Sequence, residues 1–372
     1  MNRIVVVGAS LAGHGTGRAL RRLGYAGELV FVGAEPHRPY DRPPLSKEYL
    51  AGTDVDLSLE SSLDSDDLDA EWLLGEPAVA LDAATRTVRL ADRSITADGI
   101  VLATGGVARP FGAGRTLRTL DDARALRDAF ATARSVVIVG AGFIGAEVAS
   151  TARARGLEVT VVEALPTPLA GPLGASMGAA VAALHADHGT KLICGVGVDR
   201  VEETAVHLAD GTVLEADLVV AGIGSRPAVG WLLDSGLTVD EHLGVHCDAA
   251  GGTGVPGVVA VGDCASWFDR SLRRHHRIEH WTNAVEQSRI AAATLLGQEP
   301  PPARPAYFWS DQYGLRIQFA GHALPGDSVA VEEGSVDERS FLAVYHRDEQ
   351  PVAVLAMDRV GPFARWRRKL ST

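Results

Sequence analysis

The sequence predicts an α/β protein built from two Rossmann-like domains and a small C-terminal α+β domain. Residues 3–35 are predicted to form a strand, a glycine turn, a helix and a second strand that is followed by an acid. The same order of elements returns at residues 135–163. A proline run at residues 300–302 marks a change of composition, and short strand-like segments follow it. The chain has 372 residues, which is long enough for two or three separate cores.

The overall composition excludes several classes of protein. The chain carries 35 basic and 47 acidic residues, and the resulting net charge of -12 argues against nucleic acid as the main partner. Met1 to Ile4 run directly into the first strand, and no apolar run reaches the roughly 18 residues that a membrane span needs. We therefore expect no secretory signal, no membrane partner and a cytoplasmic location.

The three cysteines are Cys194, Cys247 and Cys264, and they are too scattered for a C-x-x-C pair. The sequence therefore predicts neither a disulfide framework nor a local redox disulfide. No metal site is predicted.

The first unit begins with Arg3–Val7, a short run rich in valine that predicts a buried parallel strand. In the turn that follows, Gly8 permits the sharp bend, small Ser10 lets a pyrophosphate approach the backbone, and Gly13 lets the helix pack tightly on the strand. Glu35 stands where a ribose hydroxyl would be held. Because Ser10 replaces the usual second glycine, a glycine-rich turn without a nucleotide is the alternative for this stretch alone.

The segment that follows is rich in proline. Residues 36–47 contain four prolines, which exclude a central helix or strand, and Ser46 is expected to cap a short helix through Leu50. The acidic segment Asp64–Asp69 is expected to be solvated. Ala78–Leu90 predicts paired strands around a turn, and Ile100–Ala103 predicts a buried strand that ends at the turn Thr104-Gly105-Gly106.

The second unit has the complete motif. A strand at Ser135–Val139 leads into an intact G-x-G-x-x-G turn at residues 140–145, a helix at Ala146–Arg155 and a strand at Glu158–Val162 that ends on Glu163. A carboxylate at Glu163 accepts hydrogen bonds from a free 2'-hydroxyl and repels a 2'-phosphate. No arginine follows it before Pro172, so the sequence favours NADH over NADPH.

Two further predicted strands end in turns that contain glycine. Leu218–Gly224 predicts a strand that closes the second unit, and Val255–Asp263 predicts a strand at whose end Asp263 either binds a polyol hydroxyl or stabilises a turn. Thr282 or Asn283 is expected to cap a helix that runs to about Leu296.

Beyond the prolines, Phe308–Gly321 and Phe341–Met357 are strand-like and Arg365–Lys369 is helix-like. We expect a discontinuous first domain at 1–107 and 226–301, a second at 108–225 and a third at 302–372.

Six segments together carry a resemblance to a known family: Gly8–Gly13, Arg42–Lys47, Ala103–Gly105, Gly140–Glu147, Thr253–Asp263 and Phe308–Gln312. The chain resembles the FAD-dependent, NADH-using ferredoxin reductases of bacterial cytochromes P450 and Rieske oxygenases. These are the putidaredoxin and rubredoxin reductase-like enzymes of the glutathione-reductase structural class. Disulfide reductases of that class carry redox cysteines in the region of Arg42–Lys47, where this chain has none. The stretch after Glu163 departs from NADH-using relatives, which often carry arginines there.

The resemblance and the residue patterns imply two cofactors, FAD and NADH. The residues expected to bind FAD are Gly8, Ser10, Ala12, Gly13, Glu35, Arg42, Lys47, Ala78, Thr104, Gly105, Arg118, Gly262, Asp263 and Trp281. The residues expected to bind NADH are Gly140, Gly142, Ile144, Gly145, Glu147, Glu163, Gly222 and Gly224. By resemblance, Lys47 and Glu147 form an ion pair at the flavin and are the catalytic residues.

The expected function is to accept two electrons from NADH as a hydride and to release them one at a time. Without a redox cysteine, electrons must leave the flavin one at a time to a [2Fe-2S] ferredoxin. The [2Fe-2S] ferredoxins of such systems are usually acidic. Four arginines either guide this ferredoxin to the protein or form a solvated loop: Arg270, Arg273, Arg274 and Arg277. The expected assembly is a monomer or a weak dimer. The alternatives are an NADH oxidase or quinone reductase, and an NADH-responsive flavoprotein that signals to a binding partner.

Overall fold

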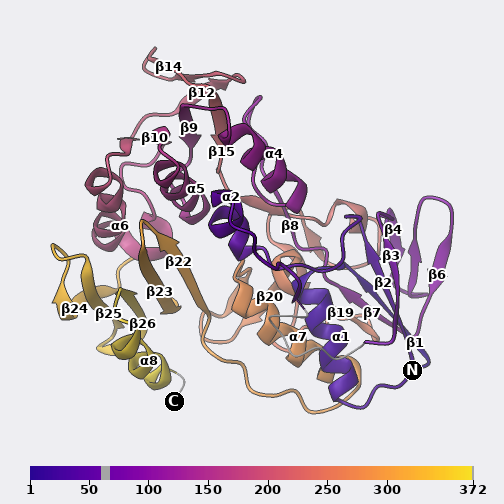
Figure 1. The fold of residues 1–372 in the computed structure, drawn as a ribbon. Helices are drawn as coiled ribbons and strands as arrows, with labels where there is room; N and C mark the ends of the chain where they lie inside the picture. Colours follow the sequence, from indigo (N-terminus) through magenta and orange to yellow (C-terminus); the bar gives the residue numbers. More distant parts are fainter. Residues whose placement is uncertain (60–67, 371–372) are drawn as a thin grey trace. The chain divides into compact units, whose positions relative to one another are not determined.

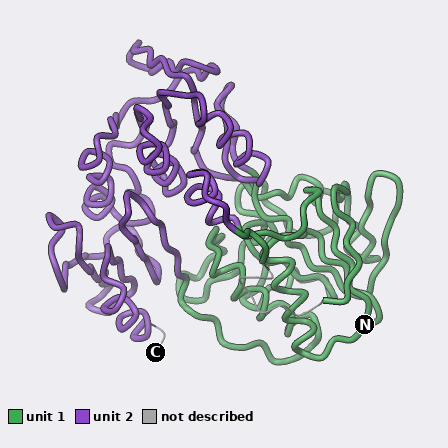
Figure 2. The backbone as a smooth tube through the Cα atoms, viewed as in Figure 1, with its two compact units in different colours: residues 1–41, 56–107, 226–306 green, residues 42–55, 108–225, 307–372 purple. Residues whose placement is uncertain are grey.

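The computed structural model describes residues 1–59 and 68–370, which fall into two compact units. Unit 1 comprises residues 1–41, 56–107 and 226–306, and unit 2 comprises residues 42–55, 108–225 and 307–372 (Figure 2). Unit 2 therefore contains both the second glycine turn and the C-terminal strands. The division into three domains stays a prediction, and the predicted acidic segment Asp64–Asp69 lies mostly outside the described residues.

Unit 1 is organised around a parallel five-stranded sheet in the order β19-β7-β1-β2-β3 (Figure 1). Its strands are β1 (Arg3–Val7), β2 (Glu28–Gly33), β3 (Ala70–Leu74), β7 (Gly99–Leu102) and β19 (Val258–Ala260). Their side chains are almost entirely buried in β1, β7 and β19, as the valine-rich runs predict. Since the chain leaves β1 toward β2 on one side and meets β7 on the other, the carboxyl end of β1 is the switch point of this sheet.

Smaller elements complete unit 1. Two helices, α1 (Leu11–Arg22) and α7 (Trp281–Leu295), pack on each other, and Ser288 Oγ in α7 donates to the Ala12 carbonyl at 2.8 Å. Among the described residues of unit 1, the smaller elements include β4 (Ala80–Asp82), β5 (Thr87–Arg89), β6 (Ser94–Thr96), η2 (Gly230–Leu232), β17 (Val239–Asp240), β18 (Gly244–Cys247), η3 (Gly262–Cys264), β20 (Ala265–Asp269) and β21 (Arg274–His276). The predicted pairing within Ala78–Leu90 is confirmed by the antiparallel β4 and β5.

Unit 2 contains a second parallel sheet, in the order β11-β10-β9-β15. Its strands are β9 (Ser135–Val139), β10 (Glu158–Glu163), β11 (Lys191–Cys194) and β15 (Leu218–Ala221), and its helices are α4 (Leu120–Phe130), α5 (Phe143–Ala154) and α6 (Ala170–Asp187). The carboxyl end of β9 is the switch point here, between β10 and β15. An antiparallel sheet lies next in sequence, with β12 (Val198–Val201), β13 (Ala205–Leu208) and β14 (Val213–Glu215).

The C-terminal part of unit 2 is an antiparallel five-stranded sheet with a terminal helix, in the order β22-β23-β26-β25-β24. The elements are β22 (Tyr307–Gln312), β23 (Leu315–Gly321), β24 (Ser328–Ser335), β25 (Ser340–Arg347), β26 (Gln350–Met357) and α8 (Val360–Lys369). Its aromatic side chains share a core with Leu173 and Met177 of α6. The predicted α+β character of this region is confirmed.

A few short elements remain. Unit 2 begins with η1 (Pro43–Ser46) and α2 (Glu48–Ala51), and a separate two-stranded sheet consists of β8 (Gly106–Ala108) and β16 (Ser225–Pro227). The predicted fold class, with two Rossmann-like halves and a small C-terminal domain, is confirmed. Within the described ranges no helix is both long enough and apolar enough to cross a bilayer.

Candidate functional site

The glycine turn of unit 1 joins β1 to α1 and depends on glycine at two positions. Gly8 has φ of +120°, and a Cβ there would overlap the carbonyl oxygen of Ala103 at the end of β7. A Cβ at Gly13 would overlap the carbonyl oxygen of Gly8, so this glycine allows α1 to approach the turn closely. Ser10 is the N-cap of α1 in an extended conformation, but its side chain does not cap the helix. The amides of the first helical turn therefore face the carboxyl end of β1 without a side-chain cap.

Three strand ends of unit 1 bring distant residues together. Because β1, β7 and β19 run parallel and adjacent, their carboxyl ends meet at one edge of the sheet. Thr104 follows β7 and donates from Oγ1 to the Ala228 carbonyl at 2.9 Å. Gly262 follows β19, donates its N–H to Gln287 Oε1 at 2.8 Å, and lies so near α1 that a Cβ there would be 2.9 Å from Ala12 Cβ. The predicted FAD residues Gly8 to Gly13, Thr104, Gly105, Gly262 and Asp263 thus come from three stretches that share one sheet edge.

Two further predicted FAD residues of unit 1 have defined partners. Glu35, two residues after β2, accepts a hydrogen bond from the Tyr40 hydroxyl at 2.5 Å, and it is partly exposed. Trp281 donates from Nε1 to Asp41 Oδ1 at 2.7 Å. Ala78 is partly buried and packs against the core of unit 1, just before β4. By contrast, the predicted FAD residues Arg42, Lys47 and Arg118 belong to unit 2.

The start of α7 differs from its prediction. The helix begins at Trp281, and its N-cap is His280 in an extended conformation, rather than Thr282 or Asn283. Asn283 lies inside the first turn, where its side-chain Nδ2 donates back to the Ile278 carbonyl at 3.1 Å. The polar side chain is therefore engaged with the preceding loop instead of with the helix amides.

The glycine turn of unit 2 shows which of its glycines the protein itself needs. Gly140 has φ of +101° and a Cβ there would be 2.5 Å from the Gly222 carbonyl oxygen; a Cβ at Gly145 would overlap the Gly140 carbonyl oxygen. A Cβ at Gly142 would meet no atom of the protein within 4 Å. Nothing in the fold requires glycine at this position, so the open space above it fits a ligand that approaches the backbone, as a dinucleotide pyrophosphate does.

The acid at the end of β10 is held against this turn. Glu163 Oε2 accepts the Ala141 N–H at 2.9 Å, and Oε1 accepts the Leu165 N–H at 3.0 Å. The side chain of Ile144, in the first turn of α5, is half exposed. Gly222 and Gly224 follow β15, which is hydrogen-bonded to β9. All eight residues predicted to bind NADH therefore lie in unit 2, and most of them at the carboxyl ends of β9, β10 and β15.

The predicted ion pair is present. Lys47 Nζ lies 2.7 Å from Glu147 Oε2, with side-chain exposures of 13% and 3%. Lys47 also donates to the Pro43 carbonyl at 3.0 Å, and Ser46 Oγ donates to the same Glu147 oxygen at 2.5 Å. A charge-assisted pair with this degree of burial is stronger than an exposed one, provided that its hydrogen bonds are satisfied.

Ser46 does not have its predicted role. It is the last residue of η1, whereas the N-cap of α2 is Lys47, without a side-chain cap. Its hydroxyl donates to Glu147 instead, and its carbonyl accepts from Thr151 Oγ1 at 2.7 Å. Both partners lie about a hundred residues away in sequence, so local capping rules do not reveal them.

One buried residue of this site was missed from the sequence. Ser310 in β22 donates from Oγ to Glu147 Oε1 at 2.6 Å and is fully buried. The signal available was the segment Phe308–Gln312, which carries the family resemblance without an assigned role.

The four arginines considered for partner docking are not equivalent. Arg270, Arg273 and Arg274 are exposed around the β20–β21 hairpin, and Arg273 has φ of +53° in its turn. Arg277 is largely buried, forms an ion pair with Glu279, and donates to the Asp263 carbonyl at 3.3 Å. Arg277 is thus part of the structure around the end of β19.

The cysteines have no features of redox or nucleophilic thiols. All three are free, and burial raises the pKa of Cys247 and of Cys264. A raised pKa disfavours the thiolate, which is the reactive form. The absence of a redox disulfide stays a prediction from the sequence.

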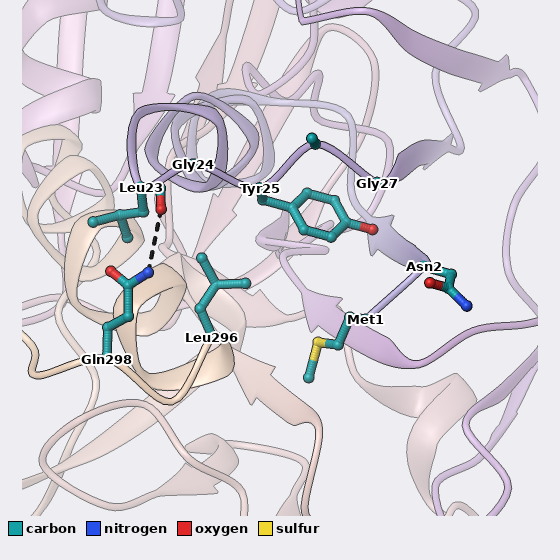
Figure 3. A pocket seen from close by; sticks show the side chains of 9 residues that line it. Met1, Asn2, Leu23, Gly24, Tyr25, Gly27, Leu296 and Gln298 are labelled. Atoms are coloured by element: carbon teal, nitrogen blue, oxygen red, sulfur yellow. Dashed lines mark hydrogen bonds between the residues drawn. The ribbon is translucent and has the colours of Figure 1, made fainter.

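The hollow drawn in Figure 3 is not where a dinucleotide is expected to bind. It has a volume of about 520 Å³ and is lined by residues such as Met1, Tyr25 and Leu296, with Gln298 Nε2 donating to the Leu23 carbonyl at 3.2 Å. Met1 precedes β1, so the hollow lies at the amino end of that strand. Ligands of parallel sheets bind at the carboxyl ends.

Two family models match the chain. The model described as pyridine nucleotide-disulphide oxidoreductase covers residues 2–288, and the model described as reductase C-terminal covers residues 307–372. This chain belongs to the pyridine nucleotide-disulphide oxidoreductase family. As a member it is an oxidoreductase, and its cofactors are FAD and NADH.

Several proteins that are similar to this chain are named as reductases. Terpredoxin reductase of a Pseudomonas species is 36% identical, with 96% of this chain and 90% of that protein covered. Putidaredoxin reductase of Pseudomonas putida is 34% identical, with 97% and 90% covered. The solved structure of the covalent putidaredoxin reductase–putidaredoxin complex matches with a TM-score of 0.92 at 32% identity, with 100% of this chain and 93% of that chain covered.

Proposed function

We propose that the protein is an FAD-dependent ferredoxin reductase that takes electrons from NADH and passes them singly to a [2Fe-2S] ferredoxin. That ferredoxin would serve a cytochrome P450 or a Rieske-type oxygenase. The carrying observation is the buried Lys47–Glu147 pair beside the cysteine-free segment Arg42–Lys47, in a chain with two dinucleotide-type glycine turns. The terpredoxin, putidaredoxin and benzene dioxygenase reductases among its relatives support this proposal.

In unit 1, the residues that hold FAD are the first glycine turn and the neighbouring strand ends. The amides of α1 would bind the pyrophosphate, Glu35 would accept hydrogen bonds from the adenosine ribose, and Asp263 would bind the ribityl chain. Trp281, which donates a hydrogen bond to Asp41, would pack against the cofactor at the start of α7. The positive end of α7 favours negative charge near its first turn.

In unit 2, the residues that hold NADH are the second glycine turn and Glu163. The space at Gly142 admits the pyrophosphate, and Glu163 accepts from the ribose hydroxyls. The chemistry that bound FAD would supply is acceptance of a hydride from NADH and release of its two electrons one at a time. The ammonium of Lys47 would supply positive charge during flavin reduction, and Glu147 fixes the position of that ammonium within unit 2.

The exposed arginines Arg270, Arg273 and Arg274 form the docking surface for the acidic ferredoxin. Charges of this kind steer a partner and act mainly on the association rate. We place the protein in the cytoplasm, as a monomer or weak dimer.

The test is NADH-driven reduction of cytochrome c by the purified flavoprotein, with and without an added [2Fe-2S] ferredoxin, and with NADPH in parallel. We expect ferredoxin to multiply the rate and NADPH to be a poor donor. If several ferredoxins have no effect on the rate while oxygen or quinone is consumed rapidly, the protein is an NADH oxidase or quinone reductase instead. Slow turnover with every acceptor and a long-lived reduced flavin would favour an NADH-responsive binding protein.

The docking surface has its own matched pair of variants. Arg270→Glu/Arg273→Glu should raise the ferredoxin KM about tenfold and flatten its salt dependence. Arg89→Glu/Arg304→Glu changes the net charge equally at exposed positions elsewhere and should alter KM less than about twofold. If the two double variants change the ferredoxin KM equally, the arginines act only through the net charge of the protein and do not form a docking surface.

A further inference from the structure

Strand β22 and helix α5 contact each other along one face of the helix. Residues 143, 147 and 150 lie on that face because they are spaced by four and then three positions. The rings of Phe143 and Phe308 meet edge to face at 4.6 Å, and the Tyr313 N–H donates to Ser150 Oγ at 2.7 Å. Between these two contacts, Ser310 reaches Glu147.

Glu147 receives hydrogen bonds on both carboxylate oxygens. Lys47 and Ser46 donate to Oε2, at 2.7 and 2.5 Å, and Ser310 donates to Oε1 at 2.6 Å. Ser310 itself accepts from Gln312 Nε2 at 3.0 Å, which leaves its own hydroxyl proton directed at Glu147. Ser310, Gln312 and Glu147 are all at least 97% buried, so each of these hydrogen bonds lies away from water.

We infer that Ser310 is a positioning residue for the Lys47–Glu147 pair, so that strand β22 sets the geometry of this ion pair. A carboxylate held at one oxygen can rotate, whereas one held at both oxygens cannot do so without losing a buried hydrogen bond. Without the Ser310 hydroxyl, Oε1 becomes a buried acceptor that has lost its donor. Glu147 then turns, and the ammonium of Lys47 moves with it. This inference rests on the proposed function, in which Lys47 acts during flavin reduction.

The experiment is anaerobic stopped-flow reduction of the bound flavin by NADH, without ferredoxin. Ser310→Ala should slow the limiting rate constant about tenfold, with less than a threefold change in the apparent Kd for NADH. Ser310→Thr retains a hydroxyl and should recover most of the rate. A crystal structure of Ser310→Ala should show Glu147 rotated and the Lys47 Nζ–Glu147 Oε2 distance lengthened.

The matched control is Ser150→Ala. It removes another hydroxyl that joins α5 to the β22 side of the domain, one turn further along the helix and away from Glu147. It should lower thermal stability as Ser310→Ala does but leave the limiting rate unchanged. If both variants slow the reaction equally, the effect is only structural and the inference is overturned.

A second comparison uses Lys47→Met, which should itself slow flavin reduction. Adding Ser310→Ala to Lys47→Met should have no further effect on the rate, because Ser310 acts through the pair. Independent, multiplicative effects would overturn the inference. So would a wild-type rate in Ser310→Ala, while the proposed function would stand. If NADH fails to reduce the wild-type flavin, the proposed function fails first, and the inference fails with it.

Discussion

The glycine turns at residues 8–13 and 140–145 use their first and third glycines in the same way and differ at the second. In both turns, a Cβ at the first glycine would press on a carbonyl of the adjacent strand end, and a Cβ at the third would overlap the carbonyl of the first. At the second position unit 2 has Gly142, where a Cβ would meet nothing, and unit 1 has Ser10. The first and third glycines thus serve the protein's own packing, whereas the packing of unit 2 does not require a glycine at the second position.

The terminal acids differ as well. Glu35 takes a hydrogen bond from the Tyr40 side chain, while Glu163 takes its hydrogen bonds from backbone amides, one of them within the glycine turn. Glu163 is therefore fixed to the turn that it follows. The acid that follows the motif therefore accepts a hydrogen bond from a side chain in unit 1 and from backbone amides in unit 2.

The largest effects should come from the first glycines. Gly8→Ala and Gly140→Ala each combine an unfavourable positive φ with a clash against backbone, and should cost roughly 3 to 5 kcal/mol of stability. Thermal unfolding with measurement of bound FAD tests Gly8, and unfolding with NAD+ binding tests Gly140. A melting temperature within about 2 °C of wild type for either variant would contradict the shared role.

Each half also has a buried histidine that weakens the protein in acid. Burial lowers the pKa of His14 in α1 and of His185 in α6 to about 4, from 6.5 in the unfolded chain. The unfolded state therefore binds protons first, and stability falls as the pH drops from 6.5 to 4, by roughly 3 kcal/mol per histidine at the lower end.

Urea unfolding across this pH range tests the histidines. His14→Gln and His185→Gln should each flatten the pH dependence, while exposed His242→Gln should not. An unchanged slope in both buried variants would show that other groups cause the acid loss.

A smaller effect is expected at the second position of the turn. Gly142→Ala should fold normally and retain FAD, but raise the Kd of NADH about 30-fold, which corresponds to about 2 kcal/mol. The reverse change in unit 1, Ser10→Gly, should leave FAD retention intact. NADH titration of both variants checks this, and a destabilised Gly142→Ala would remove the distinction between packing and ligand glycines.

The smallest effect concerns coenzyme choice. Glu163→Gln removes a charge that repels a 2'-phosphate and should lower the ratio of kcat/KM for NADH to that for NADPH about tenfold, or about 1.4 kcal/mol. Glu35→Gln, the equivalent change in unit 1, should leave the ratio unchanged. Steady-state kinetics with both coenzymes distinguishes the two acids.

Most of this organisation is local and could be predicted. Runs of valine predict strands such as β1 and β9, and the spacing of the glycines predicts the two turns. Strand β24 could not be predicted, because it is an edge strand with largely exposed side chains and gives no hydrophobic alternation.

The ion-pair environment could be predicted only in part. The family resemblance supplied Lys47 and Glu147, but the donors Ser46 and Ser310 lie 101 and 163 positions from Glu147. No periodicity connects such residues. Likewise, the sequence does not separate the largely buried Arg277 from the exposed Arg270, Arg273 and Arg274, because burial at Arg277 depends on Glu279 and the end of β19.

The sheet order of unit 1 has a consequence for the nascent chain. Strand β7 ends at Leu102, but its outer neighbour β19 begins only at Val258. At ordinary rates of translation, roughly 8 to 30 s pass between the synthesis of these two strands. During that time β7 presents an open edge, which is the kind of surface that invites wrong pairing. The parallel sheet of unit 2 is complete once β15 has emerged at Ala221, so the half of the protein that is begun first closes its sheet last.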